Sequence, residues 1–169
     1  MKKYKIIFSD LDDTLIRTLS KETFPKGIWD MGFKFNVLNK IKELKPEYLL
    51  IVSNQGGIEK GDVSKENFEK KLDYICSAIS EYCGVKVLAK YCPSRNRDNH
   101  YRKPNLGMLY AFNDELKFKN VTKTDDWKAV TLMIGDASGK FGQFSDSDKL
   151  TAEKFGIDYM DVEDFVKYE

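Results

Sequence analysis

The sequence predicts an α/β fold, a single three-layer sandwich with a parallel sheet in the middle. Two observations predict it. Several runs of apolar residues lack polar alternation, which is typical of strands buried on both faces. The segments between these runs repeat apolar residues at the period of a helix, and strands that alternate with helices form parallel sheets. The chain has 169 residues, 41% of them hydrophobic, so we expect one domain over residues 1–169.

Five segments are expected to form the strands of this sheet. Three are strongly apolar and end at polar residues, and two are weaker. The strong ones are Tyr4–Ser9, Glu47–Ser53 and Ala129–Ile134, and the weaker ones are Val85–Tyr91 and Ile157–Met160. Ligands of such folds bind beyond the carboxyl ends of the strands, so the residues that follow each strand indicate the function.

Four helices are expected between the strands, each with apolar residues on one face. The second follows Ser64, a residue type that caps helix N-termini, and the last ends at Gly156. The segment Arg17–Phe35 has no clear period and is expected to be functional or to hold small structure of its own. The apolar positions are Val37, Ile41 and Leu44; Phe68, Leu72, Ile75 and Ile79; Leu109, Phe112 and Leu116; and Leu150 to Phe155.

Charge, hydropathy and cysteine content exclude several classes of protein. With 28 basic and 27 acidic residues the net charge is +1, so any nucleic-acid contact must be local. The longest aliphatic run, Leu49–Val52, is far too short to cross a bilayer, and no signal segment is evident. Cys76, Cys83 and Cys92 have no disulfide-framework spacing. We expect an intracellular, soluble protein with free thiols and no membrane partner.

Two aspartates follow the first strand. The run Asp10-Leu11-Asp12-Asp13-Thr14 places Asp10 and Asp12 two residues apart beside a turn. Such a pair can share a hard cation and leave one oxygen free as a nucleophile. Taken alone, the motif is more often a solvated acidic turn.

Three further segments carry polar residues in an ordered set. Ser53-Asn54-Gln55-Gly56-Gly57 follows the second strand and offers a hydroxyl and exposed amides to an anion. Arg102-Lys103-Pro104 precedes a helix expected from Asn105 to Leu116, where a cation favours anion binding. Asp136 follows the last clear strand, and Ser145-Asp146-Ser147-Asp148 precedes the next helix. Each is an ordinary polar turn when taken alone, whereas together they indicate a phosphate and metal site.

The order of these motifs resembles the four signature motifs of the haloacid dehalogenase (HAD) superfamily of phosphotransferases. Most members hydrolyse phosphate esters with Mg²⁺ on a Rossmann-like, HAD-type sheet. The family commonly has glycine at the position of Asp13, a minor departure because aspartate tolerates tight turns. By matching position, the resemblance implies Asp10 as nucleophile, Asp12 as general acid and base, Ser53 and Asn54 as phosphate-binding residues, Lys103 as the cation that holds the phosphate, Thr14 as a support for Asp12, and Asp10, Asp12 and Asp136 as Mg²⁺ ligands.

Five segments carry a narrower resemblance: Thr23–Gly27, Ser53–Ile58, Tyr101–Met108, Gly135–Lys140 and Phe144–Lys149. With Ala152 and Gly156-Ile157 they resemble the 3′-phosphatase domain of polynucleotide kinase/phosphatase over nearly the whole chain. The resemblance implies a supporting role for Asp148 near the metal and a phosphate or backbone contact for Arg102. Gln143 and Lys140 stand where that family has an acid and an arginine, which puts fine substrate contacts in question.

The spacing of the motifs leaves no room for a large cap domain. Predicted helices and strands largely fill the intervals from Thr14 to Ser53 and from Gly57 to Lys103. An uncapped site is open, which suits a phosphate at the end of a polymer or on a protein.

A basic stretch adds a second indication of a polymeric substrate. Cations interleaved with rings are typical of a nucleic-acid groove, although a solvated basic loop explains the composition equally well. Phe24 and Trp29 are further candidates to stack on a base, though packing is the commoner role of an aromatic residue. The cations are Lys86, Lys90, Arg95, Arg97, Arg102 and Lys103, and the rings are Tyr91, His100 and Tyr101.

We therefore expect a Mg²⁺-dependent polynucleotide 3′-phosphatase of nucleic-acid end repair. Its substrate would be a 3′-phosphorylated polynucleotide, and its partner a separate kinase or ligase. Two alternatives stay open: a HAD phosphatase of a small ester of the histidinol-phosphate or sugar-phosphate type, and a catalytically silent end-binding module. A zinc loop at Cys92 and His100 is not expected, because too few ligands surround them, and Trp127 is expected to be structural.

Overall fold

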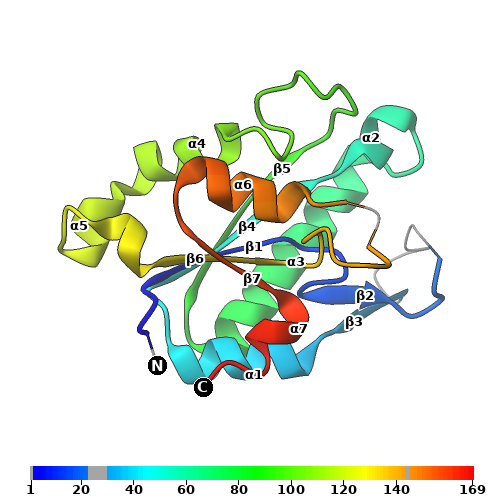
Figure 1. Ribbon diagram of the computed structural model, residues 1–169. Coiled ribbons are helices and arrows are strands. Elements are labelled where there is room, and N and C mark those ends of the chain that lie inside the picture. Colours follow the sequence, from blue (N-terminus) through cyan, green and yellow to red (C-terminus); the bar gives the residue numbers. More distant parts are fainter. Residues whose placement is uncertain (1, 23–29, 144) are drawn as a thin grey trace.

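The computed structural model has the predicted three-layer α/β sandwich, and it describes residues 2–22, 30–143 and 145–169. A parallel five-stranded sheet forms the middle layer (Figure 1). All five strands lie within two residues of the predicted segments. In spatial order they are β5 (Lys86–Cys92), β4 (Tyr48–Asn54), β1 (Ile6–Ser9), β6 (Thr131–Gly135) and β7 (Asp158–Asp161).

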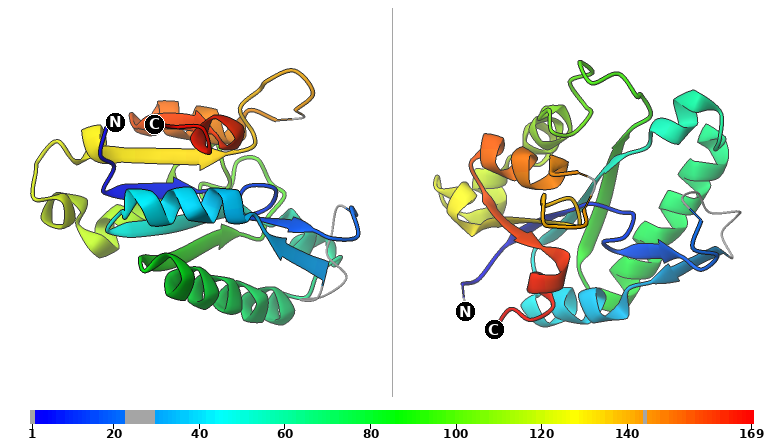
Figure 2. Two further views of the ribbon diagram at one scale, coloured as in Figure 1. Left: turned by 90° about the horizontal axis from the view of Figure 1, so that it is seen from below. Right: turned by 45° about the vertical axis from the view of Figure 1, so that its right-hand side comes forward.

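Helices cover both faces of the sheet because the strands are apolar on both faces. Successive residues of a strand point to opposite sides, so Ile7 packs into one core while Ile6 and Phe8 pack into the other. In Figure 1, α4 and α6 lie above the sheet and α1 and α7 below it, and Figure 2 gives two further views of the layers. The first core includes residues of α1 (Phe35–Leu44), α3 (Lys65–Cys83) and α7 (Val162–Phe165), and the second includes residues of α4 (Gly107–Leu116), α5 (Phe118–Thr122) and α6 (Ser147–Phe155).

The predicted helix ends are largely confirmed. The Ser64 side chain caps α3 by accepting a hydrogen bond from the N–H of Asn67 (3.0 Å), and Gly156 ends α6 in the left-handed conformation. The helix expected from Asn105 begins at Gly107 instead. The Asn105 side chain donates to the carbonyl oxygens of Arg97 (2.8 Å) and Asn99 (2.9 Å), so it belongs to the preceding loop.

Several short elements have no counterpart in the predicted set. The aperiodic segment Arg17–Phe35 contributes to a hairpin of β2 (Ile16–Thr18) and β3 (Met31–Phe33), while Phe24, Trp29 and the segment Thr23–Gly27 lie outside the described residues. Helix α2 (Gly56–Lys60) and the 3₁₀ helix η2 (Trp127–Val130) are too short to show a period. Trp127 is structural as predicted, because its ring packs against Phe118 (5.1 Å between centroids) and Phe155 (5.6 Å). Among the described residues, no helix has the length and apolarity needed to span a membrane.

The strand order places β1 where the chain changes direction across the sheet. The chain moves from β1 outward through β4 to β5, and then returns to the other side of β1 to form β6 and β7. Loops that leave in opposite directions open a crevice at the carboxyl ends of such strands. Asp10 follows the last residue of β1 and therefore lies at this crevice.

Candidate active site

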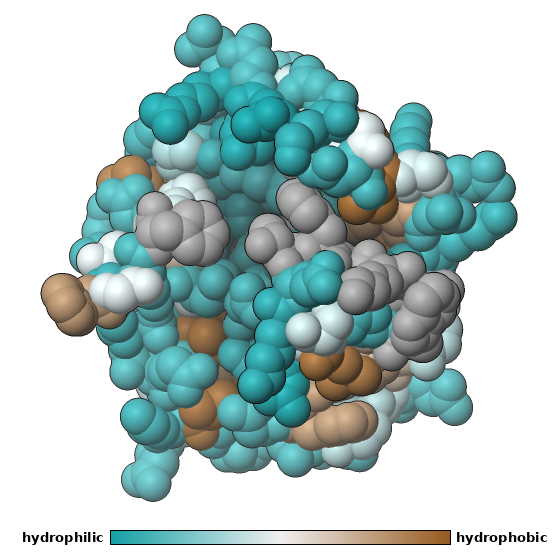
Figure 3. Space-filling view, turned by 90° about the vertical axis from the view of Figure 1, so that its right-hand side faces the viewer, coloured by the Kyte–Doolittle hydropathy of each residue, from teal (hydrophilic) through white to brown (hydrophobic). Residues whose placement is uncertain are grey.

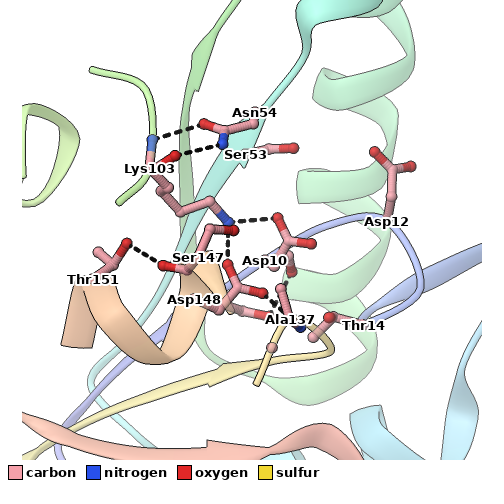
Figure 4. Close-up of polar contacts among 12 residues, drawn as sticks. Asp10, Asp12, Thr14, Ser53, Asn54, Lys103, Ala137, Ser147, Asp148 and Thr151 are labelled. Carbon is pink, nitrogen blue, oxygen red and sulfur yellow. Dashed lines mark hydrogen bonds and ion pairs between the residues drawn. The ribbon is translucent and has the colours of Figure 1, made fainter. Parts of the chain in front are cut away.

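The centre of the site is an ion triad in which the Lys103 and Asp148 side chains are buried and the Asp10 side chain is 15% exposed. Lys103 extends its Nζ to Oδ1 of Asp10 (2.7 Å) and to Oδ1 of Asp148 (2.6 Å), as Figure 4 shows. The side chains of Lys103 and Asp148 are 2% and 1% exposed. The predicted nucleophile and the predicted cation therefore meet, although 93 residues separate them in the chain.

Asn54 holds the main chain of Lys103. Its Nδ2 donates to the Lys103 carbonyl oxygen (3.0 Å), and its Oδ1 accepts from the Lys103 N–H (2.9 Å). Both polar ends of the side chain are thus occupied. Asn54 therefore does not have the predicted role of contacting phosphate. Its side chain fixes the main chain of the loop that carries Lys103.

Asp148 lies in the site itself rather than at its margin. Its Oδ2 accepts from the N–H of Ala137 (3.2 Å), so the start of α6 and the loop after β6 both fix the carboxylate. Gly135 makes room for it, since a Cβ at that position would lie 2.6 Å from Cγ of Asp148. The glycine that ends β6 is therefore required by the close approach of a charged side chain.

Three carboxylates converge beside Lys103. Oxygen atoms of Asp10, Asp136 and Asp148 lie within 4.8 Å of one another. Thr14 donates its hydroxyl hydrogen to Oδ1 of Asp136 (3.2 Å), so it orients this aspartate and not Asp12 as predicted. Carboxylate oxygens at this spacing are the ligands that Mg²⁺ prefers in proteins, and the donor set fits that ion.

The electrostatics of the cluster also favour a cation. Burial raises the pKa of Asp10 well above its ordinary value; Lys103 opposes the rise, while Asp148 and Asp136 add to it. Burial and the charge of Asp148 likewise raise the pKa of Asp136. Burial alone would lower the pKa of Lys103, but Asp10 and Asp148 raise it, so its ammonium stays charged. A divalent cation would favour the ionised form of every carboxylate here.

Asp12 lies apart from this cluster. Figure 4 shows its carboxylate turned away from Asp10, and its Oδ2 accepts a hydrogen bond from Nε2 of Gln55 (2.7 Å). The same nitrogen donates to Oγ of Ser53 (2.8 Å). The position of the Asp12 carboxylate gives no support to its predicted role as a Mg²⁺ ligand. Its predicted role in proton transfer requires a position away from the cluster of Asp10, Asp136 and Asp148, because a bound cation would compete for the proton.

Two residues that interact with Asp12, Gln55 and Lys71, were not predicted from the sequence. The sequence shows Gln55 only as part of a polar turn. Lys71, on α3, is 7% exposed and lies in a helical stretch of apolar residues that gave no sign of the site. Burial lowers the pKa of Lys71, and the charges of Asp12 and Asp30 oppose this.

Two arginines lie over the start of α2, three residues beyond Ser53 in the chain. A Cβ at Gly56 would lie 2.8 Å from Cγ of Arg95 and 3.5 Å from Nη1 of Arg102. Arg102 also donates to the carbonyl oxygen of Ser94 (2.9 Å), which fixes the guanidinium. The predicted phosphate contact of Arg102 stays a prediction, and Arg95 lies beside the same glycine.

Three residues of the predicted basic groove have contacts elsewhere in the fold. Lys86 begins β5, at the opposite end of the strand from the site, and Lys90 pairs with Glu115 (2.8 Å). Tyr91 packs on Phe68 (4.8 Å between centroids) and donates to Glu69 (2.6 Å). These three residues were wrongly assigned to a groove, because strand pairing and helix packing direct them elsewhere.

A separate groove of about 740 Å³ lies between the 97–107 loop, α4 and α6. It contains cations and rings, but also two acidic side chains, so it is not a continuous basic track.

Figure 3 looks onto the side of the molecule that is on the right in Figure 1; this face is mostly hydrophilic and is hollowed near its centre. The charged and aromatic residues of the groove are Arg97, Asp98, His100, Tyr101, Tyr110, Asp114 and Lys154.

Gln143 and Lys140 brace the loop between β6 and α6. Gln143 accepts from the N–H (2.7 Å) and hydroxyl (2.8 Å) of Ser138 and donates to Asp161 (2.8 Å). Lys140 pairs with Asp164 (2.7 Å). The two departures from the family pattern therefore make structural contacts, and Phe144 of the same loop lies outside the described residues.

The fold and the site define a HAD phosphatase. Within this class, the chain belongs to the polynucleotide kinase 3 phosphatase family, whose model matches residues 5–166.

Relatives in sequence agree with this membership. A 20.8 kDa protein encoded in the FGF-VUBI intergenic region of Autographa californica nuclear polyhedrosis virus is 30% identical, over 99% of this chain and 88% of that protein. The bifunctional polynucleotide phosphatase/kinase of Schizosaccharomyces pombe is also 30% identical, over 97% of this chain but 38% of that protein. A putative enzyme of the same name from Acanthamoeba polyphaga mimivirus is 28% identical, and 40% of it is covered. The chain thus spans about two fifths of the two bifunctional relatives.

Solved structures agree with the fold. The D,D-heptose 1.7-bisphosphate phosphatase of B. bronchiseptica, crystallised with magnesium and phosphate, superposes with a TM-score of 0.66 at 20% identity, covering 94% of this chain and 79% of that one. A putative HAD-like phosphatase from Mesorhizobium loti gives a TM-score of 0.64 at 20% identity, covering 93% and 71%.

Proposed function

We propose that this protein is a Mg²⁺-dependent polynucleotide 3′-phosphatase that converts a terminal 3′-phosphate of DNA or RNA into a 3′-hydroxyl. The observation that carries the proposal is the contact of Lys103 with Asp10 and Asp148 in a chain whose family model covers residues 5–166. Binding of a nucleic-acid end alone would need neither a nucleophile nor a separate acid. Asp10 and Asp12, held apart, supply both.

In the first step, a carboxylate oxygen of Asp10 attacks phosphorus and the bond from phosphorus to the 3′-oxygen breaks. Asp12 donates a proton to that departing oxygen, which leaves as the 3′-hydroxyl. Lys103 balances charge on the nucleophile and the phosphoryl group, and the Ser53 hydroxyl donates to a phosphoryl oxygen. The product of this step is an aspartyl-phosphate on Asp10.

In the second step, Asp12 takes a proton from a water molecule, whose oxygen attacks the phosphorus of the intermediate. The acyl-phosphate bond breaks, inorganic phosphate leaves and the Asp10 carboxylate is restored. Asp10 and Asp136 would hold Mg²⁺, with Asp148 beside them, and the ion would neutralise charge on the phosphoryl oxygens.

The surroundings of the site support a polymeric substrate. In the part of the chain that the structure describes, the hairpin of β2 and β3 and α1 lie between Thr14 and β4, and no additional domain covers the carboxyl ends of the strands. Arg95 and Arg102 lie side by side over Gly56, where they can meet the phosphates that precede the terminal one. The proposed role in end repair, and a separate kinase or ligase partner, follow from this activity.

One assay tests the proposal and its rivals. Phosphate release would be measured, with Mg²⁺ and with EDTA, from 3′-phosphorylated DNA and RNA oligonucleotides, a 5′-phosphorylated oligonucleotide and a 3′-mononucleotide. Preference for a 3′-phosphorylated polymer that is lost in EDTA is expected. Equal activity on the mononucleotide would favour a phosphatase of small esters, and salt-sensitive binding without phosphate release would favour an end-binding module.

The variant Asp10→Asn tests the nucleophile. It keeps the size of the side chain but removes the attacking carboxylate, so turnover should fall to background in a protein that still unfolds cooperatively. Persistent phosphate release by this variant would rule out the aspartyl-phosphate route.

A further inference from the structure

Gln55 connects two residues of the site that act on different atoms of the substrate. Its Nε2 lies 2.7 Å from Oδ2 of Asp12 and 2.8 Å from Oγ of Ser53. A side-chain amide nitrogen carries two hydrogens, and this geometry uses both. Neither the metal cluster nor the ion triad includes this residue.

The direction of both hydrogen bonds follows from chemistry. The amide nitrogen faces Oδ2 of Asp12, and this oxygen accepts both when the group is ionised and when the proton for the leaving oxygen is on Oδ1. Because the same nitrogen faces Ser53, the serine oxygen is the acceptor in that contact. The main chain of Gln55 is itself anchored, since its N–H donates to the carbonyl oxygen of Cys92 (2.7 Å).

This arrangement leaves the hydroxyl hydrogen of Ser53 free for the substrate. The residue is 1% exposed and its oxygen accepts from Gln55. Within residues 2–22, 30–143 and 145–169, no acceptor takes the hydrogen that Ser53 itself can donate. A phosphoryl oxygen held beside Asp10 would be its partner.

The same contact holds Asp12 away from the nucleophile, as a general acid for the departing oxygen requires. In an in-line displacement the nucleophile and the departing oxygen lie on opposite sides of phosphorus. A general acid must therefore lie away from the nucleophile by the width of that group. Asp12 is turned away from Asp10 in Figure 4, and a single amide nitrogen separates it from the phosphate-binding hydroxyl.

We propose that Gln55 is a positioning residue, which holds the Asp12 carboxylate toward the departing oxygen and turns the Ser53 hydroxyl toward a phosphoryl oxygen. The inference rests on the proposed function for its substrate, but it concerns the hydrolysis of any phosphate ester at this site.

The test compares leaving groups, because a merely structural role would affect all substrates alike. A 3′-phosphorylated oligonucleotide loses an alkoxide, which needs the proton of Asp12, whereas 4-nitrophenyl phosphate loses a phenolate, which does not. In single-turnover measurements, Gln55→Leu should slow cleavage of the oligonucleotide by about 10–100-fold, a part of the 10²–10⁴-fold that general acids supply. Cleavage of the aryl ester should slow by less than about 3-fold, and KM should rise for both substrates because Ser53 loses its orientation.

A double-mutant cycle gives the second measurement. If Gln55 acts on the leaving oxygen through Asp12, adding Gln55→Leu to Asp12→Asn should slow oligonucleotide cleavage by less than about 3-fold, the part that passes through Ser53. Gln143→Leu is the matched control, since it removes the amide that braces the 137–146 loop, and it should leave the ratio of the two substrates unchanged. Gln55→Glu, which keeps the side chain polar, replaces Gln55→Leu if the latter does not fold, and it should show the same selective loss.

Equal slowing of both substrates, or additive effects in the cycle, would overturn the inference. A wild-type protein that leaves 3′-phosphorylated oligonucleotides intact would refute the proposed function alone. The alkyl ester of the comparison is then a 3′-mononucleotide, and the ratio still tests Gln55.

Discussion

Removing the ammonium of Lys103 should destabilise the protein as well as inactivate it. Lys103→Met keeps the apolar stem of the side chain but leaves Asp10 and Asp148 without their shared cation. The Lys103 and Asp148 side chains are 2% and 1% exposed, so water screens the contact little. Breaking a buried pair by removing one partner costs about 3–5 kcal/mol.

The pH dependence of this loss has a definite sign. Burial already raises the pKa of Asp10, and without Lys103 it rises further. A carboxyl group whose pKa is higher in the folded than in the unfolded protein destabilises the folded state as the pH rises between those two values. The loss of unfolding free energy that Lys103→Met causes, relative to the wild type, should therefore be larger at pH 8 than at pH 5.

Thermal unfolding in EDTA measures both effects. In a protein of this size 1 kcal/mol shifts the midpoint by about 2–4 °C, so Lys103→Met should unfold about 6–20 °C lower at pH 8. Lys70→Met is the control, because it removes an exposed pair with Glu66 whose side chains are 67% and 77% exposed. That change should cost less than about 1 kcal/mol. A Lys103→Met midpoint within about 2 °C of the wild type would refute the view that this triad stabilises the fold.

Three further changes test other parts of the site. Mg²⁺ should raise the unfolding midpoint more at pH 8 than at pH 5.5, because burial raises the pKa of Asp10 and Asp136 and the ion binds their ionised forms; equal shifts in a thermal melt would contradict this. Gly135→Ala should displace the Asp148 carboxylate, lower the stability by about 1–3 kcal/mol and reduce phosphate release; an unchanged melt and rate would show that the carboxylate can move at no cost. Arg95→Ala combined with Arg97→Ala should lower kcat/KM for a 3′-phosphorylated oligonucleotide by about 10-fold and weaken the salt dependence of its cleavage. The kcat/KM for 4-nitrophenyl phosphate should stay unchanged. An equal loss of kcat/KM for both substrates would argue against a role in holding a polymer.

The layered fold was predictable because its signal is strong and local. Strands such as β4 and β6 are buried on both faces, so their residues are apolar without alternation. The hairpin of β2 and β3 has three residues in each strand, too few for any period to be visible. The start of α4 was predicted two residues too early because the Asn105 side chain donates to loop carbonyl oxygens. No pattern of hydropathy encodes such a tertiary contact.

The members of the site were predictable, whereas their contacts were not. Parallel strands bring their carboxyl ends to one edge, so residues that follow β1, β4 and β6 had to meet. Which atoms meet depends on rotamers and packing. Asn54 thus holds a main chain rather than a phosphate, and Thr14 supports Asp136 rather than Asp12.

Charge explains why the site separates its aspartates into two groups. Asp10, Asp136 and Asp148 lie together, whereas one ammonium, that of Lys103, contacts two of them, so the acidic groups of this cluster outnumber the basic one. Burial and the neighbouring carboxylates raise the pKa of Asp10 and of Asp136, and a divalent cation at the cluster would offset this and favour the ionised forms that a nucleophile and metal ligands need. A metal ion bound to Asp12 would remove the proton that the leaving oxygen needs. The hydrogen bond from Gln55 holds Asp12 outside the cluster, where a metal ion bound by the other aspartates does not compete for its proton.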